Sequence, residues 1–232
     1  MSRKRSHSLT FDVLQRLGQE IVSGKYSKDI SFPTEAELGE EYDVSRSVIR
    51  EAVKMLTVKG LLYARPRRGT VVTNEDHWDL LDQDILNWLL KREVSIPLMI
   101  DFTQIRLAIE PQAAFLAATN ITDAQRLTLK EAIKAMELAE LGEQSPLETD
   151  IAFHLAVLSA SNNRFMILMD NFVETALRFS IRRSNKIKGV KIASVEEHKA
   201  VADAILAGEA ELAKQGMEKM LIEVLHIFNQ AD

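Results

Sequence analysis

Residues 44–52 read Val-Ser-Arg-Ser-Val-Ile-Arg-Glu-Ala, and they follow a short helical segment after a turn of only a few residues. Serine is a favoured N-cap residue, so Ser45 can cap the start of a helix. Glycine is favoured just after the end of a helix, as at Gly60, so a helix is predicted between these two residues. The preceding segment also starts with a helix signal, because Thr34 and Glu37 have the spacing of a capping box. Two short helices joined by a tight turn are typical of the helix-turn-helix motif, whose second helix binds DNA.

Elements on both sides of this motif complete a small domain. Apolar residues recur with a 3.6-residue period over residues 9–23, which predicts a further helix before the motif. After the motif, residues 61–64 and 70–73 are short β-prone runs, and the basic, glycine-containing segment 65–69 joins them as a hairpin. The sequence therefore predicts a winged helix-turn-helix domain over residues 1–76, with three helices and a β-hairpin wing.

Helical periodicity dominates the remainder of the chain, where no strand pattern or internal repeat occurs. Glycine, proline and asparagine residues separate the predicted helices, which lie near residues 82–92, 98–119, 123–141, 147–161, 163–184, 194–207 and 209–229. We therefore expect a mostly α protein whose second domain, residues 77–232, is an all-α bundle of six to seven helices.

Composition narrows the class of protein. The 232 residues include no cysteine, which excludes disulfides, a thiol nucleophile and thiolate metal ligands. No apolar run approaches the roughly 18 residues of a membrane span, and charged residues interrupt the region where an export signal would need apolar ones. A cytoplasmic protein without a membrane partner is expected. Residues 1–76 carry 13 basic and 11 acidic side chains and the remainder 16 and 23, which weakly favours an anion-binding front domain.

The start of the predicted recognition helix carries groups suited to DNA binding. The hydroxyls of Ser45 and Ser47, with the helix-end amides, can hold a phosphate. Arg46 can bind a guanine edge through two hydrogen bonds, and Arg50 lies one turn further along the same face. The hairpin tip adds basic side chains beside a glycine, at Arg65, Arg67, Arg68 and Gly69. Taken alone, a serine and an arginine at a helix start more often form a cap and a solvated charge.

These residues belong to a longer pattern that extends over about residues 9–73. It includes Phe32-Pro33-Thr34-Glu35-Ala36-Glu37-Leu38, the stretch 44–52, and Arg68-Gly69-Thr70-Val71-Val72. This pattern resembles the winged-helix domain of the GntR family of bacterial regulators. The resemblance implies DNA contacts by Ser45, Arg46, Ser47, Arg50, Arg68 and Gly69. Some relatives have a basic residue where Ala36 stands, so no contact from the second helix is expected.

Polar side chains at four positions stand out in the predicted bundle. Asp150 and His154 are four residues apart, so they face the same side of a helix, and His198 begins another helix. One carboxylate and two imidazoles that point inward would suit Zn²⁺ or a similar divalent ion. Arg106 would suit a carboxylate ligand, because its planar fork matches two oxygens. The plainer alternatives are a helix cap at Asp150, a core histidine at His154, and an ion pair between Arg106 and Glu110.

A second resemblance bears on these alternatives. Asp150-Ile151-Ala152-Phe153-His154, Ser161-Asn162-Asn163 and Glu197-His198 are similar to the ligand-binding FCD domain of the FadR subfamily, over roughly residues 83–229. Metal-binding members supply one Asp and three His ligands, and the resemblance assigns the first three to Asp150, His154 and His198. The fourth position is Met220, a poor ligand for Zn²⁺, although Glu223 lies one turn further. A divalent metal held by three protein ligands and a metal-free pocket both stay open.

The connector from Trp78 to Trp88 resembles that of regulators of sugar-acid catabolism. This resemblance implies a hydroxylated carboxylate as effector, with Arg106 holding the carboxylate. We therefore expect a homodimeric repressor rather than an enzyme, bound to a near-palindromic double-stranded operator and released by a small organic acid. The alternative is a metal-dependent hydrolase that uses Asp150, His154 and His198, but no residue nearby is an obvious general base. A purely architectural DNA binder would leave the polar groups of the bundle without a role.

Overall fold

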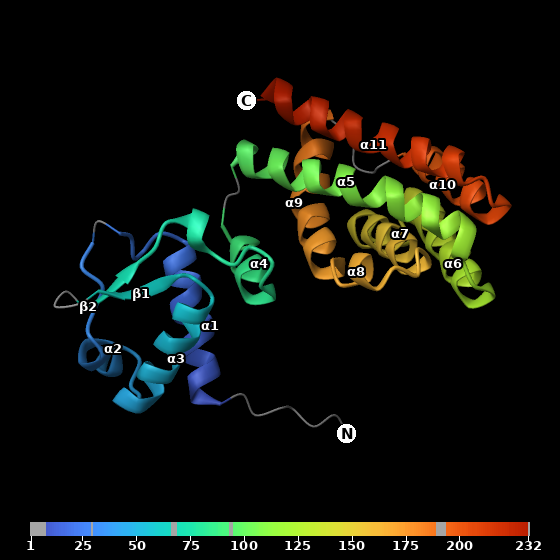
Figure 1. The fold of residues 1–232 in the computed structure, drawn as a ribbon. Coiled ribbons are helices and arrows are strands. Elements are labelled where there is room, and N and C mark those ends of the chain that lie inside the picture. Colours follow the sequence, from blue (N-terminus) through green and yellow to red (C-terminus); the bar gives the residue numbers. More distant parts are fainter. Residues whose placement is uncertain (1–7, 29, 66–68, 93–94, 189–193, 232) are drawn as a thin grey trace. The chain divides into compact units, whose positions relative to one another are not determined.

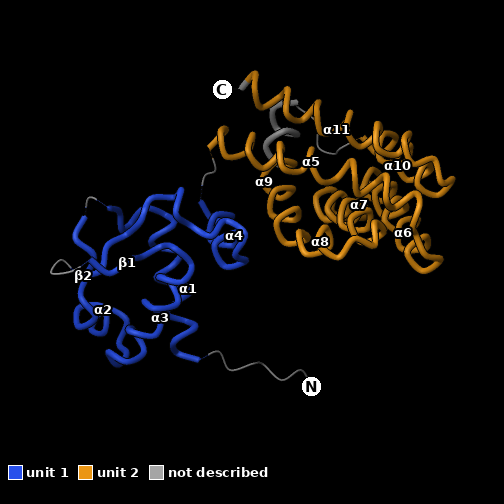
Figure 2. Tube along the Cα trace, viewed as in Figure 1, with its two compact units in different colours: residues 1–93 blue, residues 94–232 orange. Residues whose placement is uncertain are grey.

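The computed structural model describes residues 8–28, 30–65, 69–92, 95–188 and 194–231, and it is mostly helical (Figure 1). The chain divides into two compact units, residues 1–93 and residues 94–232 (Figure 2). In the described part of the chain, no helix combines the length and the apolar character that crossing a membrane requires.

The first unit is a winged helix-turn-helix fold, as predicted. Its elements are α1 (Leu9–Val22), α2 (Glu35–Glu41), α3 (Arg46–Val58), β1 (Leu62–Arg65), β2 (Gly69–Val72), the 3-10 helix η1 (Glu75–His77) and α4 (Gln83–Leu89). The two strands form an antiparallel hairpin in which Leu62 is opposite Val72 and Arg65 is opposite Gly69. The capping box predicted at the start of α2 is present, with Thr34 and Glu37 bonded reciprocally.

The core of this unit forms where α1 packs on α3. Apolar residues on the inner face of α1, including Leu14 and Leu17, are fully buried. Ile49 and Leu56 of α3 are buried against the same core, which leaves the opposite face of α3 exposed. The amphipathic pattern of each helix therefore fixes which side of α3 faces outward.

Helix α4 and the connector before it belong to the first unit. Trp88 is fully buried against α1, and its indole Nε1 donates a hydrogen bond to Gln15 Oε1 at 2.9 Å. At the end of α3, Lys59 Nζ lies 2.6 Å from an oxygen of Asp82, the residue that caps α4. These contacts hold α4 on the DNA-binding fold. The predicted boundary after residue 76 therefore differs from the division of the structure, which falls at residue 93.

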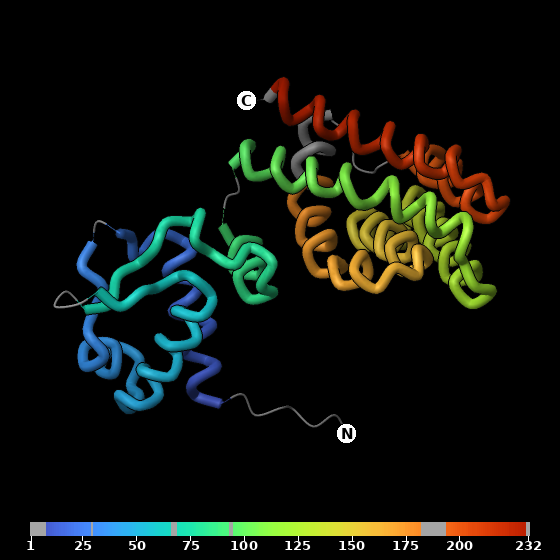
Figure 3. Tube along the Cα trace, viewed as in Figure 1, coloured from blue at the N-terminus to red at the C-terminus, as the bar shows by residue number. Residues whose placement is uncertain are grey.

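The described residues of the second unit form seven helices and no strand, in agreement with the predicted all-α bundle. They are α5 (Ile96–Asn120), α6 (Asp123–Glu140), α7 (Pro146–Ala160), α8 (Arg164–Ile167), α9 (Asp170–Lys188), α10 (Val195–Ala207) and α11 (Ala210–Ala231). Helix α11 runs alongside α5, and α5 also contacts α7, α9 and α10 (Figure 3). Because α5 is enclosed by so many neighbours, its polar residues Arg106 and Glu110 are buried.

One helix prediction was wrong in this unit. The single helix expected over residues 163–184 is two helices, because the chain turns at Leu168 between α8 and α9. The side chain of Asn163 caps α8 by accepting hydrogen bonds from the amides of Phe165 and Met166. No glycine or proline marks the turn at Leu168, and the apolar period continues through it, so the sequence contains no signal that the helix ends there.

Candidate DNA-binding surface and buried Asp-His-His site

The N-terminal end of α3 presents an exposed polar surface. Ser45, Arg46, Ser47 and Arg50 are all exposed. Ser45 occupies the N-cap position, as predicted, but its hydroxyl makes no capping hydrogen bond and instead lies 2.9 Å from the Ser47 hydroxyl. The first amides of α3 are therefore left without a side-chain cap from Ser45, which suits binding of a phosphate at this helix end.

Arg50 is held by a carboxylate from the preceding helix. Its Nη2 lies 2.9 Å and its Nε 3.2 Å from the oxygens of Glu35, at the start of α2. This hydrogen bond, together with the charge of Arg46, keeps the pKa of Glu35 below its ordinary value. Both partners are exposed, so the pair orients Arg50 more than it stabilises the fold.

The wing carries the remaining predicted DNA contacts. Gly69 is exposed and has a φ of +77°, a left-handed conformation that favours glycine at this turn. Arg65 at the end of β1 is also exposed. Arg68 and its neighbour Arg67 lie outside the described residues, so their predicted contacts stay predictions.

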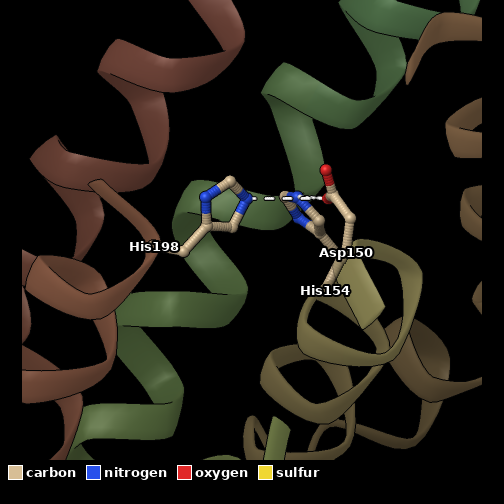
Figure 4. A group of neighbouring side chains, drawn as sticks. All are labelled: Asp150, His154 and His198. Carbon is tan, nitrogen blue, oxygen red and sulfur yellow. Dashed lines mark ion pairs between the residues drawn. The ribbon is translucent and has the colours of Figure 1, made fainter. Parts of the chain in front are cut away.

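In the bundle, the structure brings Asp150, His154 and His198 together. Asp150 and His154 lie one turn apart on α7, and His198 comes from α10 (Figure 4). Oδ1 of Asp150 is 3.3 Å from Nε2 of His154 and 3.6 Å from Nε2 of His198. One ligand atom from each residue lies within 4.8 Å of the others, and all three residues are buried. Asp150 is therefore not a solvent-exposed helix cap.

In both imidazoles, Nδ1 is the ring nitrogen that does not face Asp150, and it lies next to a hydrogen-bond acceptor. Nδ1 of His198 is 2.7 Å from the carbonyl oxygen of Ser194, which can only accept, so this nitrogen carries the proton. Nδ1 of His154 is 2.5 Å from Oε2 of Glu110 on α5. Both Nε2 atoms are thus directed at Asp150 and at one shared position. This is the arrangement in which metal-binding histidines are usually held.

A buried ion pair supports the site from α5. Arg106 Nε lies 2.5 Å from Oε1 of Glu110, and Arg106 Nη1 donates to the Ser180 hydroxyl at 3.2 Å. The sequence left two roles open for Arg106, and the structure shows the ion pair with Glu110. Burial opposes ionisation of Glu110, but Arg106 and His154 outweigh it and lower the pKa of Glu110 to about 2.

The two carboxylates also act on the histidines. Burial alone would lower the pKa of His154, but Glu110 and Asp150 raise it above its ordinary value. The pKa of Asp150 is low because hydrogen bonds from both histidines overcome its burial. Nε2 of His154 faces Oδ1 of Asp150, and a divalent ion bound there would take the place of any proton on this nitrogen.

The sequence predicted the three candidate ligands that the structure brings together, but not the residues that support them. Met220, at the expected fourth-ligand position, is buried, whereas Glu223 is exposed and does not join the cluster among the described residues. Glu110 was considered only as a partner for Arg106, and its contact with His154 was not predicted. The single sign in the sequence was a glutamate that, like Arg106, interrupts the apolar residues of segment 105–111.

Each of the two units matches a known protein family. Residues 9–72 match the model of bacterial regulatory proteins of the gntR family, and residues 101–223 match that of the FCD domain. The chain is 32% identical to the HTH-type transcriptional regulator YieP of Escherichia coli, over 92% of this chain and 93% of that protein. It is 30% identical to the galactonate operon transcriptional repressor of Escherichia coli, over 88% of this chain and 90% of that protein. Among solved structures, it is similar to Streptococcus agalactiae GntR, with 27% identity, a TM-score of 0.51, and coverage of 94% of this chain and 99% of that one.

Proposed function

Because the chain belongs to the GntR family of bacterial regulatory proteins and contains an FCD domain, we propose that it represses an operon for organic-acid catabolism and is released from DNA by a carboxylate effector. Its relatives are transcriptional regulators rather than enzymes, so the hydrolase considered from the sequence has no support. Such a regulator works on DNA in the cytoplasm. The observation that carries the proposal is the joining of a DNA-binding fold to a bundle with a buried cluster of metal-ligating side chains.

The DNA-binding step uses the exposed face of α3. Two copies of the chain, related by a two-fold axis, would place two such helices in major grooves about 34 Å apart on a near-palindromic operator. Arg46 would bind a guanine edge, and the hydroxyls of Ser45 and Ser47 with the adjacent amides would hold a phosphate. Arg50 would contact DNA from its position beside Glu35. Arg68 and Gly69 at the wing tip would contact the backbone or the minor groove.

The buried cluster fits a divalent metal ion. Two imidazole nitrogens and one carboxylate oxygen are directed at one position, and both imidazoles have their other nitrogen bonded to an acceptor. Three protein ligands of this kind are typical of Zn²⁺ sites that keep open positions for other oxygens. Met220 would not fill the fourth position, because a thioether is a poor ligand for such an ion. The ion would supply a positive charge that binds and orients an anionic oxygen.

The charges around the cluster favour an effector with one carboxylate. With neutral imidazoles, Asp150, Glu110 and Arg106 carry a net charge of −1, and a divalent ion would change it to +1. A single carboxylate would then balance the buried charge, which matters because an uncompensated charge in the interior is costly. Glu110 already occupies the Nε side of the Arg106 guanidinium. Arg106 would therefore attract the effector's carboxylate by its positive charge from a position beside the ion. A hydroxylated sugar acid would offer both a carboxylate and a neighbouring hydroxyl oxygen.

A combined metal and ligand screen tests this proposal. The purified full-length chain is analysed for bound metals, stripped with a chelator, and reloaded with Zn²⁺ or another divalent ion. Thermal unfolding is then recorded with a panel of sugar acids and hydroxy acids, with and without the ion. A true effector should raise the unfolding temperature by mass action, and only in the metal-loaded protein. Equal responses of stripped and loaded protein to every acid would contradict a metal-held effector.

A further inference from the structure

We infer that Glu110 is a positioning residue of the metal site, which fixes His154 in the tautomer that presents Nε2 to the ion. This inference rests on the proposed function, because it assumes that Asp150, His154 and His198 hold a divalent metal. Nothing in the family resemblance or in the matched relatives' names assigns a role to Glu110. The inference comes from the contacts that this side chain makes between α5 and α7.

Glu110 connects two charged groups from a completely buried position. Its side chain is 0% exposed, so both of its oxygens must find partners inside the bundle. Oε2 lies 2.5 Å from Nδ1 of His154, and Oε1 lies 2.5 Å from Nε of Arg106. Arg106 Nη2 also donates to Oε2, at 3.4 Å. One carboxylate therefore joins the guanidinium on its own helix to a ligand imidazole on α7.

The contact with His154 determines which ring nitrogen can bind the ion. An ionised carboxylate only accepts hydrogen bonds, so Nδ1 of His154 must carry a proton. In a neutral imidazole the lone pair is then on Nε2, the atom that faces Asp150. A carboxylate partner also makes the imidazole a stronger donor to the metal, and loss of such a partner typically costs about 10–100-fold in metal affinity. His198 has a backbone carbonyl in the same place, so the two ligands are supported in different ways.

A competing explanation is that Glu110 serves only to neutralise Arg106. In that case its proximity to His154 would be incidental, and metal affinity would depend on the charge of Arg106 alone. The two explanations differ for a protein in which both charges are removed. If Glu110 acts on His154, its loss should weaken metal binding whether or not Arg106 is present. If it acts only on Arg106, its loss should have no effect once Arg106 has been replaced.

The test compares Glu110→Gln, Arg106→Gln and the double variant with the wild-type full-length chain. Each protein is stripped of metal, and its affinity for Zn²⁺ alone is measured by competition with a chromophoric chelator. We expect Glu110→Gln to bind Zn²⁺ about 10–100-fold more weakly, and we expect the double variant to be at least about 10-fold weaker than Arg106→Gln. Equal affinities of Arg106→Gln and the double variant would overturn the inference. Glu148→Gln is the matched control, because Glu148 also pairs with an arginine but at the surface of the bundle.

An NMR measurement on the wild-type protein keeps the inference testable if a variant does not fold. Long-range ¹H–¹⁵N spectra of the Zn²⁺-loaded chain report the protonation of each ring nitrogen. For both His154 and His198 we expect a proton on Nδ1 and a metal bond at Nε2. Metal bound through Nδ1 of His154 would overturn the inference and leave the metal site itself intact. A wild-type chain that binds no divalent ion would overturn both the metal site and the role of Glu110.

Discussion

The replacement of Gly18 by alanine tests how firmly α4 is attached to the DNA-binding fold. Gly18 lies on α1 where the ring of Trp88 crosses it, and a Cβ atom there would lie 2.5 Å from two carbons of that ring. Ordinary van der Waals contact begins near 3.4 Å, so the ring must move by roughly 1 Å. Trp88 is fully buried and bonded to Gln15, which leaves it little freedom to move.

Two opposing effects set the size of the change in stability. Alanine in the middle of a helix is favoured over glycine by about 1 kcal/mol. Overpacking of a buried site typically costs about 1–3 kcal/mol, and a rigid indole ring places Gly18→Ala at the upper end of that range. We therefore expect a net loss of about 2 kcal/mol in the free energy of unfolding of the first unit. For a unit of this size, that corresponds to a decrease of roughly 8–16 °C in its melting temperature.

Tryptophan fluorescence is the appropriate assay for this variant. Both tryptophans of the chain, Trp78 and Trp88, lie within residues 1–93, so urea unfolding followed by their emission reports on the first unit in the full-length protein. In a Trp88→Phe background the clashing ring carbons are absent, and the same glycine replacement should become neutral or stabilising. A Gly18→Ala protein as stable as the wild type, or a loss that persists without the indole, would refute this packing argument.

Three further predictions concern DNA binding and pH. Arg46→Ala should weaken operator binding by about 1–3 kcal/mol per half-site, with the loss confined to one base-pair position in each half-site, as measured by fluorescence anisotropy with a set of single-base operator variants. Glu35→Gln should leave thermal stability nearly unchanged but raise affinity for non-specific DNA at low salt, because it removes the carboxylate paired with Arg50, a proposed DNA contact; an unchanged affinity would show that Glu35 lies away from DNA. Because the pKa of Glu110 is lowered from about 4.5 to about 2, its ionised form stabilises the metal-free protein above pH 4.5, and this contribution should disappear as the pH falls from 4.5 towards 2. Melting temperatures across that range should therefore decrease less steeply for Glu110→Gln than for the wild type.

Local sequence signals predicted the first unit well. A capping box at Thr34, a serine at the start of α3 and a glycine at the end of α3 all act within one or two turns, and the structure contains helices with those bounds. The attachment of α4 was not predicted, because it depends on the packing of Trp88 against Gly18, two residues 70 positions apart. A contact between residues so far apart in the sequence produces no periodic pattern from which it could be predicted.

In the candidate site too, contacts within one helix could be predicted from residue spacing in the sequence, whereas contacts between helices could not. The four-residue spacing of Asp150 and His154 places both on one side of α7 for geometric reasons alone. The approach of His198 from α10 could be expected only from the family resemblance. The contact between Glu110 and His154 depends on how α5 packs against α7, so the spacing of Arg106 and Glu110 indicated an ion pair and nothing more.

Operator release by a metal-held anion is the most direct test of the account. The measurement is fluorescence anisotropy of a labelled operator fragment, titrated with the acid that stabilises the protein most in the screen. With Zn²⁺-loaded wild-type chain, the acid should release the operator at concentrations near its binding constant. Asp150→Asn, which removes the only carboxylate among the three proposed metal ligands, should bind the operator normally but need far more acid to release it. Equal release of the operator from both proteins would contradict the account.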